Sequence, residues 1–200
     1  MAEDVPLSCT CGNVRCVVRD AGPEHGDRLV CHCNDCRDFV RLLGREAEVL
    51  TEHGGVSIYH TRVGNLELVG GADSLAAVHL TEKPLLRWYA ACCNTPLFST
   101  TDKAPKAFLS INTFGIAPCD RDRVLGPPIA NLFVASATRP DPPGKAASIL
   151  SMLPRFLPRI FKDSFGGGWR KSPLFDPQTQ RPIAAPRRLA DAEKRRLGRG

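Results

Sequence analysis

The stretch Cys31-His32-Cys33-Asn34-Asp35-Cys36-Arg37 places three cysteines within six residues. Two more groups of closely spaced cysteines occur in the chain, Cys9-Thr10-Cys11-Gly12 before it and Cys92-Cys93 after it. The nine cysteines are fewer than one in twenty of the 200 residues, a share below that of domains held together by disulfides. A reducing compartment also prevents lasting disulfides. The grouping therefore predicts metal ligation or thiol chemistry.

Zinc suits such groups best, because it prefers a tetrahedral shell of thiolates at about 2.3 Å, and a short spacing brings two sulfurs to one side of a turn. In a first predicted site, Cys9 and Cys11 meet Cys92 and Cys93. Four sulfurs saturate the ion and leave no position for a substrate. We therefore expect this site to be structural.

In a second predicted site, Cys31, Cys33 and Cys36 offer three thiolates from one loop. His32 or a water molecule would complete the tetrahedron, which is typical of a catalytic zinc ion. The alternative is that both sites are structural. We expect the His32 side chain to point away from its neighbours into solvent, with a substrate contact or a fourth ligand as the alternative.

Two cysteines stand outside these groups, and both are expected to be small buried hydrophobic residues. They are Cys16 and Cys119.

Length and composition predict one globular domain with an appendage. The chain is 42% hydrophobic and 24% charged, which excludes disorder throughout. It has no apolar run long enough to cross a bilayer, and its start lacks the basic and apolar parts of a signal peptide, so we expect a cytoplasmic protein. Residues 1–138 carry 13 basic and 16 acidic side chains, against 14 and 5 in residues 139–200. The net charge of +6 therefore belongs to the tail.

Short apolar or alternating runs separated by turns predict a mainly β fold, an antiparallel barrel or sandwich with short helices. One helix is expected over 38–44, capped by Asn34 or Asp35, with Phe39, Leu42 and Leu43 facing inward. The expected strands are 13–18, 28–31, 56–59, 66–69, 75–80, 85–90 and 107–111.

The division predicted is a zinc-binding domain over 1–138 and a basic, partly helical extension over 139–200. Apolar residues of the extension recur at helical spacing over 149–165, but Pro154 and Pro158 predict two short kinked pieces. We expect this segment to pack on the β core as a lid, anchored by Trp169, and a helix on a membrane surface is the alternative. The final 30 residues are expected to lack a core of their own and to end in solvent.

Three motifs resemble those of one known family. Ser8-Cys9-Thr10-Cys11-Gly12, the loop from Cys31 to Arg37, and Cys93-Asn94-Thr95-Pro96-Leu97 are similar to the opening strand, central loop and closing zinc turn of the glutathione-dependent formaldehyde-activating enzymes. This family also includes centromere protein V, and the resemblance covers about residues 5–135. In the closing turn, Ala90 stands where the family has a cysteine. Cys92 is the nearest substitute ligand, with Cys16 or Cys119 in reserve.

The resemblance implies a compact antiparallel β fold with two zinc sites. It also implies that glutathione and formaldehyde meet at Cys31, Cys33 and Cys36, as substrates of a zinc-dependent carbon–sulfur lyase that acts on thiol adducts of a small aldehyde. His32, Asp35 and Arg37 would position the substrate or move a proton. A zinc-stabilised binding module without turnover is the second reading. A nucleic-acid-associated protein comes third, because the basic tail lacks a recognition helix or an aromatic platform.

Overall fold

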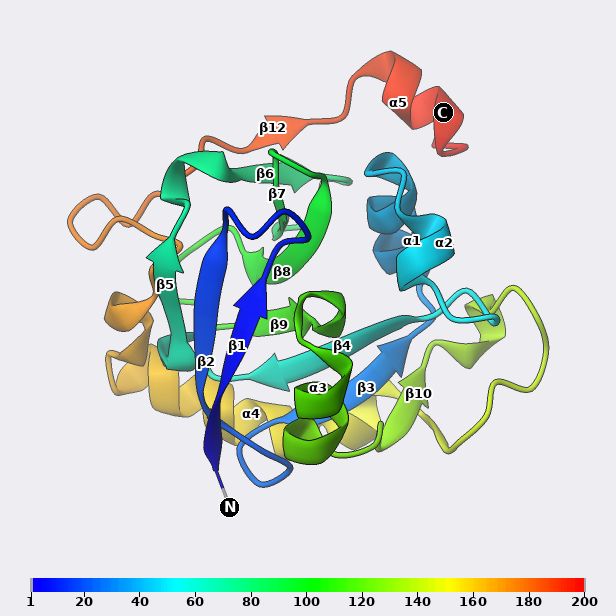
Figure 1. The fold of residues 1–200 in the computed structure, drawn as a ribbon, viewed down its shortest axis with the longest axis horizontal. Helices are drawn as coiled ribbons and strands as arrows, with labels where there is room; N and C mark the ends of the chain where they lie inside the picture. The colour runs from blue at the N-terminus through cyan, green and yellow to red at the C-terminus, as the bar shows by residue number, and fades with distance from the viewer. Residues whose placement is uncertain (1, 200) are drawn as a thin grey trace.

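The computed structural model describes residues 2–199, and within them the chain is mainly β, with two sheets and five α-helices (Figure 1). The small sheet has the order β1 (Glu3–Ser8), β2 (Arg15–Ala21), β5 (Leu66–Gly70). The large sheet has the order β11 (Ala146–Ala147), β10 (Ala130–Leu132), β3 (Asp27–Cys31), β4 (Val56–Thr61), β9 (Leu109–Asn112), β8 (Thr95–Thr101), β7 (Leu85–Ala90), β6 (Leu75–His79), β12 (Arg187–Arg188). The helices are α1 (Asn34–Leu42), α2 (Glu46–Val49), α3 (Pro118–Leu125), α4 (Ile149–Phe165) and α5 (Asp191–Arg196).

The main core lies between the two sheets. Alternating residues of β1, such as Val5 and Leu7, are buried against side chains of the large sheet that include Trp88, Leu109 and Ile111. Most strand pairs are antiparallel, while β10 runs parallel to β3 and to β11, and β12 runs parallel to β6. The prediction of a mainly β, largely antiparallel fold is therefore confirmed.

Each predicted strand coincides with an observed one, but β1, the short strands β10, β11 and β12, and the central strand β8 were missed. All residues from Thr95 to Thr100 are buried. Because β8 is covered on both faces, its sequence shows none of the alternation that marks a half-buried strand.

The predicted position of the first helix was wrong by one turn. Helix α1 begins at Asn34, and its cap is Cys33, whose Sγ accepts a hydrogen bond from the Cys36 N–H at 3.4 Å. The sulfur takes the role expected of the Asn34 or Asp35 side chain. Phe39, Leu42 and Leu43 are buried, as predicted.

The prediction of two kinked pieces in the extension was also wrong, because α4 is one helix of 17 residues. Pro154 and Pro158 are four residues apart and both are exposed, so they lie on the solvent side of the helix. The carbonyl groups that lose a hydrogen bond there can bind water instead, and the other side of the helix is held by the protein.

Helix α4 packs on the outer part of the large sheet, as predicted. Phe156 is buried with Leu29, Ala130 and Leu132. The buried Asp27 carboxylate accepts hydrogen bonds from Arg155 at 2.6 Å and from Arg159.

A second buried carboxylate holds the end of α4. Asp163 accepts hydrogen bonds from Arg62 Nε at 2.9 Å and from the Gly64 N–H at 3.2 Å. The two buried carboxylates thus join α4 to β3 and to the segment after β4, which come more than 90 residues earlier in the sequence.

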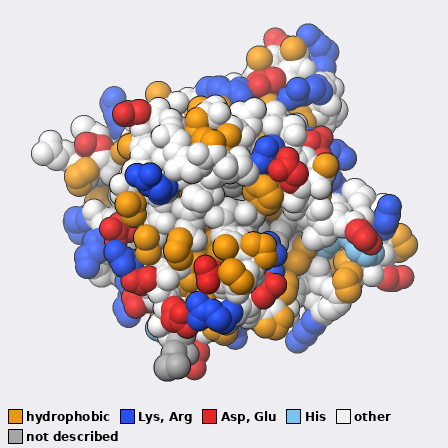
Figure 2. Space-filling view, in the orientation of Figure 1, with side chains coloured by type: hydrophobic (Ala, Val, Ile, Leu, Met, Phe, Trp, Pro, Cys, Tyr) orange, Lys and Arg blue, Asp and Glu red, His pale blue; other side chains and the backbone are white. Residues whose placement is uncertain are grey.

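The last part of the chain shares the core of the strands. Trp169 is buried, and Phe175 makes an edge contact with Trp88 at a ring-centroid distance of 6.1 Å. Leu189 joins the buried cluster of Phe39 and Val78. Basic side chains near α5 lie at the surface at the upper right of Figure 2.

Of the helices that the structure describes, none combines the length and the apolar character needed to span a lipid bilayer.

Replacing the buried Asp163 with alanine should lower the free energy of unfolding by about 3 kcal/mol, because Arg62 would lose its buried counter-charge. Urea denaturation of both proteins measures the difference. Asp191→Ala removes a carboxylate from an exposed pair with Lys194 and should change stability by less than about 0.5 kcal/mol. Equal effects of the two substitutions would contradict the assigned role of Asp163.

Candidate metal centres

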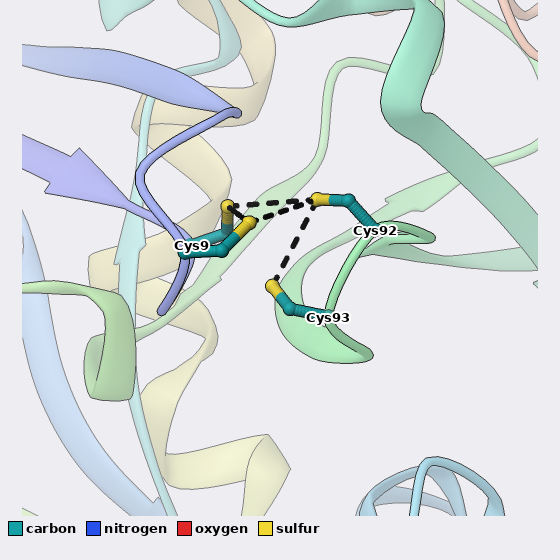
Figure 3. Close-up of side chains that lie close together, drawn as sticks. Cys9, Cys92 and Cys93 are labelled. Carbon is teal, nitrogen blue, oxygen red and sulfur yellow. Dashed lines mark hydrogen bonds between the residues drawn. The ribbon is translucent and has the colours of Figure 1, made fainter.

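The first cluster joins two turns that are far apart in the sequence. Cys9 and Cys11 lie in the turn between β1 and β2, while Cys92 and Cys93 lie in the turn between β7 and β8 (Figure 3). The four sulfur atoms lie within 4.8 Å of one another. Individual Sγ–Sγ distances are 3.5 Å for Cys9–Cys11, 3.8 Å for Cys9–Cys92, 3.3 Å for Cys11–Cys92 and 3.9 Å for Cys92–Cys93.

Left-handed backbone positions shape both turns. Gly12 has φ +75° directly after Cys11, and Asn94 has φ +54° directly after Cys93. Glycine adopts this conformation freely, and asparagine tolerates it better than most residues.

The spacing of this cluster fits a zinc ion. Four ligands at about 2.3 Å from a tetrahedral centre are about 3.8 Å from one another. The sulfur atoms meet this spacing as free thiols, without a disulfide. The cluster is completed by Cys92, and neither Cys16 nor Cys119 takes part in it.

Hydrogen bonds favour the ionised form of one thiol in the first cluster. Burial raises the pKa of Cys93, but hydrogen bonds from Thr10 and Thr95 outweigh it and lower that pKa to about 5. Thr95 Oγ1 lies 3.1 Å from Cys93 Sγ and also accepts a hydrogen bond from the Thr10 N–H at 3.1 Å. Burial and the neighbouring sulfurs raise the pKa of Cys92 to about 12. Cys93 is therefore ionised at neutral pH.

The second cluster lies where β3 ends and α1 begins. Cys31 is the last residue of β3, Cys33 caps α1, and Cys36 lies in its first turn. The three sulfur atoms lie within 4.8 Å of one another, and Cys31 and Cys33 are 3.4 Å apart. The chemistry of three thiolates at this spacing also fits zinc.

A buried arginine accompanies the second cluster. Arg87 Nη1 lies 3.6 Å from Cys36 Sγ and donates a hydrogen bond to Ser99 Oγ at 2.7 Å. Hydrogen bonds from Cys31 and Cys33, followed by the charge of Arg87, hold the pKa of Cys36 well below its usual range. The same sulfur contacts raise the pKa of Cys31.

The second cluster forms part of the wall of a cavity of about 300 Å³. Most of the other wall residues are apolar and come from strands, from the segments before β9 and after β10, and from α4; they include Leu29, Ile58, Leu85, Phe108, Leu132, Phe133, Ile149 and Phe156. The three-cysteine cluster thus faces a space that can hold a small molecule.

One row of polar residues crosses the floor of this cavity. Arg87 on β7 pairs in register with Ser99 on β8, Ser99 pairs with Ser110 on β9, and Ser110 pairs with His60 on β4. All four are buried and line the cavity. The row therefore leads from Cys36 across four adjacent strands to a histidine.

His60 was not predicted from the sequence, since a single histidine in an apolar strand carries no motif. Its ring lies between Phe156, stacked at a centroid distance of 4.3 Å, and Phe108 at 4.8 Å. Neither ring nitrogen has a hydrogen-bond partner among the described residues. Burial, followed by the charge of Arg159, lowers the pKa of His60 to about 4. The imidazole is therefore neutral at physiological pH.

The three residues predicted to bind substrate lie in different places. Asp35 lines the cavity and pairs with Lys83 at 3.0 Å and Arg199 at 2.6 Å. Burial alone would raise the pKa of Asp35, but Arg199 and Lys83 outweigh burial and lower this pKa below its ordinary value. The Asp35 side chain is therefore an ionised carboxylate. The Arg37 side chain does not line the cavity; it donates to the Ser136 carbonyl at 2.9 Å and to Asn34 Oδ1 at 2.6 Å.

His32 points away from the cysteines, as expected, but it is buried, so the expectation of an exposed side chain was wrong. Its Nε2 lies 2.9 Å from Asn131 Oδ1 and its Nδ1 lies 3.2 Å from the His53 carbonyl. Successive side chains of an extended segment alternate between its faces, so His32 points to the side opposite Cys31 and Cys33 and meets β10 there.

Of the two remaining cysteines, Cys16 is buried in the main core as predicted, and burial raises its pKa to about 12. Cys119 is exposed, so the prediction that it is buried was wrong. It lies in the first turn of α3, a helix that buries only Val124 and Leu125.

Substitution of Cys92 with serine should remove one ligand from the first cluster and lower the zinc content from about two ions per chain to about one. Elemental analysis of the purified protein measures this. The chain should also melt at a lower temperature, because the metal joins two distant turns. Cys119→Ser, which changes an exposed cysteine, should keep both ions, and an unchanged zinc content in the Cys92 variant would contradict the assignment.

His60 makes the stability of the fold depend on pH. Its pKa is about 4 in the folded chain and near 6.5 when unfolded, so the unfolded chain takes up a proton first as the pH falls. The stabilisation from keeping His60 neutral is complete above the pKa of the unfolded chain. It is lost as the pH falls toward the pKa of about 4 in the folded chain.

Between about pH 7.5 and about pH 5, wild type should lose about 2 kcal/mol more unfolding free energy than His60→Phe. Urea denaturation at both pH values measures this difference. His25→Phe changes an exposed histidine and serves as the control. Identical losses in wild type and in His60→Phe would exclude a buried, neutral His60.

Comparison with known proteins gives the family but no activity. A crystal structure of a Rhodobacter sphaeroides protein, a Northeast Structural Genomics target, is similar at 19% sequence identity and a TM-score of 0.40, over 60% of this chain and 97% of that chain. No curated protein matches the chain. The profile of a family of unknown function, DUF6151, matches residues 1–185. Because this match spans most of the chain, the protein belongs to the DUF6151 family.

Proposed function

We propose that the protein is a zinc-dependent carbon–sulfur lyase that acts on adducts between a thiol, such as glutathione, and formaldehyde or another small aldehyde. The observation that carries this proposal is the contrast between the two clusters. The first has four sulfurs and needs no further ligand, while the second has three and lies on the wall of a cavity. The likeness of the cysteine motifs to those of the formaldehyde-activating enzymes supports the same reaction.

Cys31, Cys33 and Cys36 would hold the catalytic ion, and Cys9, Cys11, Cys92 and Cys93 the structural one. A zinc ion with three thiolate ligands supplies a Lewis acid that keeps a bound thiol ionised near neutral pH.

Arg87 balances the charge of the second site. Three thiolates and a divalent cation have a net charge of −1, and the buried guanidinium lies beside Cys36. Replacing this arginine would leave an uncompensated charge in a buried position.

The proposed reaction involves no oxidation or reduction. The thiol sulfur forms a bond to the aldehyde carbon, the carbon–oxygen double bond becomes a single bond, and the oxygen takes up a proton, giving a hemithioacetal. The lyase direction breaks the same carbon–sulfur bond and returns the proton to solvent or to the thiol.

The side chains around the cavity can bind the substrate. Asp35 is a carboxylate and can accept a hydrogen bond from an ammonium group, while Lys83 beside it can contact a carboxylate. The row from Arg87 to His60 can bind polar groups of an elongated ligand. The apolar walls exclude water from the reacting atoms.

Cys33→Ser tests this function. The variant should keep the first zinc ion and its fold, lose the second ion, and lose glutathione-dependent consumption of formaldehyde. Elemental analysis, circular dichroism and an assay of formaldehyde measure the three properties. Cys119→Ser should behave as wild type.

Two results would overturn the proposal. If the Cys33 variant keeps the zinc content of wild type, the second cluster is not a metal site. If zinc-loaded wild type does not consume formaldehyde in the presence of glutathione, the protein is instead a zinc-stabilised binding module without this activity.

A further inference from the structure

Helix α4 has a second apolar face that the fold does not use. Its inner side packs on the sheet through Phe156. Its outer side exposes large apolar residues, with 75% of Leu150, 38% of Leu157, 52% of Phe161 and 83% of Phe165 accessible.

These exposed residues form one stripe. Their separations of seven, four and four residues place them on the same side of a helix, and the exposed Pro154 and Pro158 continue that side. Phe161 and Phe165 stack on each other at a centroid distance of 5.6 Å. We call the side chains of Leu150, Pro154, Leu157, Pro158, Phe161 and Phe165 the outer stripe. It contains no charged residue.

A stripe of this size is unusual on a protein surface in contact with water. Single exposed apolar residues are common, whereas a contiguous exposed group marks a contact with a protein or a membrane.

The charges of the segment that carries the outer stripe indicate which partner fits. Residues 142–175 contain six basic residues and one acidic residue, Asp163, which is buried against Arg62. Arg155 and Arg159 pair with Asp27. The other four basic residues are exposed, and none of them has an acidic partner within 4.0 Å among residues 2–199. These four are Lys145, Lys162, Arg170 and Lys171.

This arrangement favours an anionic lipid surface over a second copy of the chain. Two copies that met through the outer stripe would bring their uncompensated basic residues together, and like charges repel. Phosphate groups of lipids would attract the same residues while the acyl region takes up the aromatic and aliphatic side chains.

We propose that the outer stripe of α4 binds the surface of an anionic phospholipid bilayer. The helix lies in the plane of the membrane interface, with its inner side still packed on the β core and its outer stripe inserted among the lipids. This inference stands apart from the zinc centres and does not require the proposed activity.

Flotation with phospholipid vesicles tests the proposal on the full, zinc-loaded chain. Wild type should float with phosphatidylcholine vesicles that contain phosphatidylglycerol, float less with phosphatidylcholine alone, and lose binding as the salt concentration rises. The double variant Phe161→Ser/Phe165→Ser should bind at least about tenfold more weakly, because two exposed rings can no longer insert.

Two further variants separate the contributions. Val69→Ser, which changes an exposed apolar residue on β5, should float as wild type does. The triple variant Lys162→Gln/Arg170→Gln/Lys171→Gln should lose the preference for vesicles with phosphatidylglycerol. Thermal melting should show that all the variants are folded, because the residues changed are exposed.

Two outcomes would overturn the proposal. The first is that wild type does not float with anionic vesicles, or that the Phe161/Phe165 double variant floats equally well. The second is a dimer in analytical ultracentrifugation that the same double variant abolishes, without flotation of wild type, because the outer stripe would then bind a second copy.

Discussion

Close approach of clustered cysteine sulfur atoms is the constraint on which the rest of the structure depends. Seven cysteines form two groups, and within each group the sulfurs lie no more than 4.8 Å apart as free thiols. Thiolates at such distances repel one another strongly in a protein interior, and a shared cation turns that repulsion into attraction. Metal binding would then contribute directly to the free energy of folding, because no such site exists in the unfolded chain.

Strand β7 connects the two groups. Arg87 near its centre reaches Cys36, Trp88 next to it lies in the main core, and the turn after its end carries Cys92 and Cys93. Neighbouring side chains of a strand point to opposite faces, so one strand can serve the cavity with one face and the core with the other.

Helix α4 forms part of the cavity wall. Phe156 and Ile149 contribute to its wall, and the buried ion pairs of Asp27 and Asp163 hold the helix in place. The extension is thus part of the proposed site, although its sequence contains none of the clustered cysteines. An outer stripe bound to lipid would place this wall of the cavity next to the membrane surface.

The groups Cys9-Thr10-Cys11 and Cys31 to Cys36 could be predicted because short spacings constrain the sulfurs locally, whatever the rest of the fold does. The strands with alternating residues could be predicted for the same reason. The meeting of Cys9 and Cys11 with Cys92 and Cys93 was predicted from the need of a zinc ion for four ligands. Strand β8, the continuity of α4 and the role of His60 depend on contacts with distant residues. Burial on both faces hid β8, and the ion pairs of α4 outweighed the prolines at 154 and 158. The burial of His32 also depended on a distant partner, Asn131 on β10.

X-ray absorption at the zinc edge of the purified protein tests the central claim most directly, because it counts the atoms bound to the metal. A four-sulfur centre and a three-sulfur centre with one lighter ligand predict an average between three and four sulfur neighbours per zinc at about 2.3 Å. A first shell made mainly of nitrogen and oxygen, or a protein purified without bound zinc under non-chelating conditions, would contradict the account.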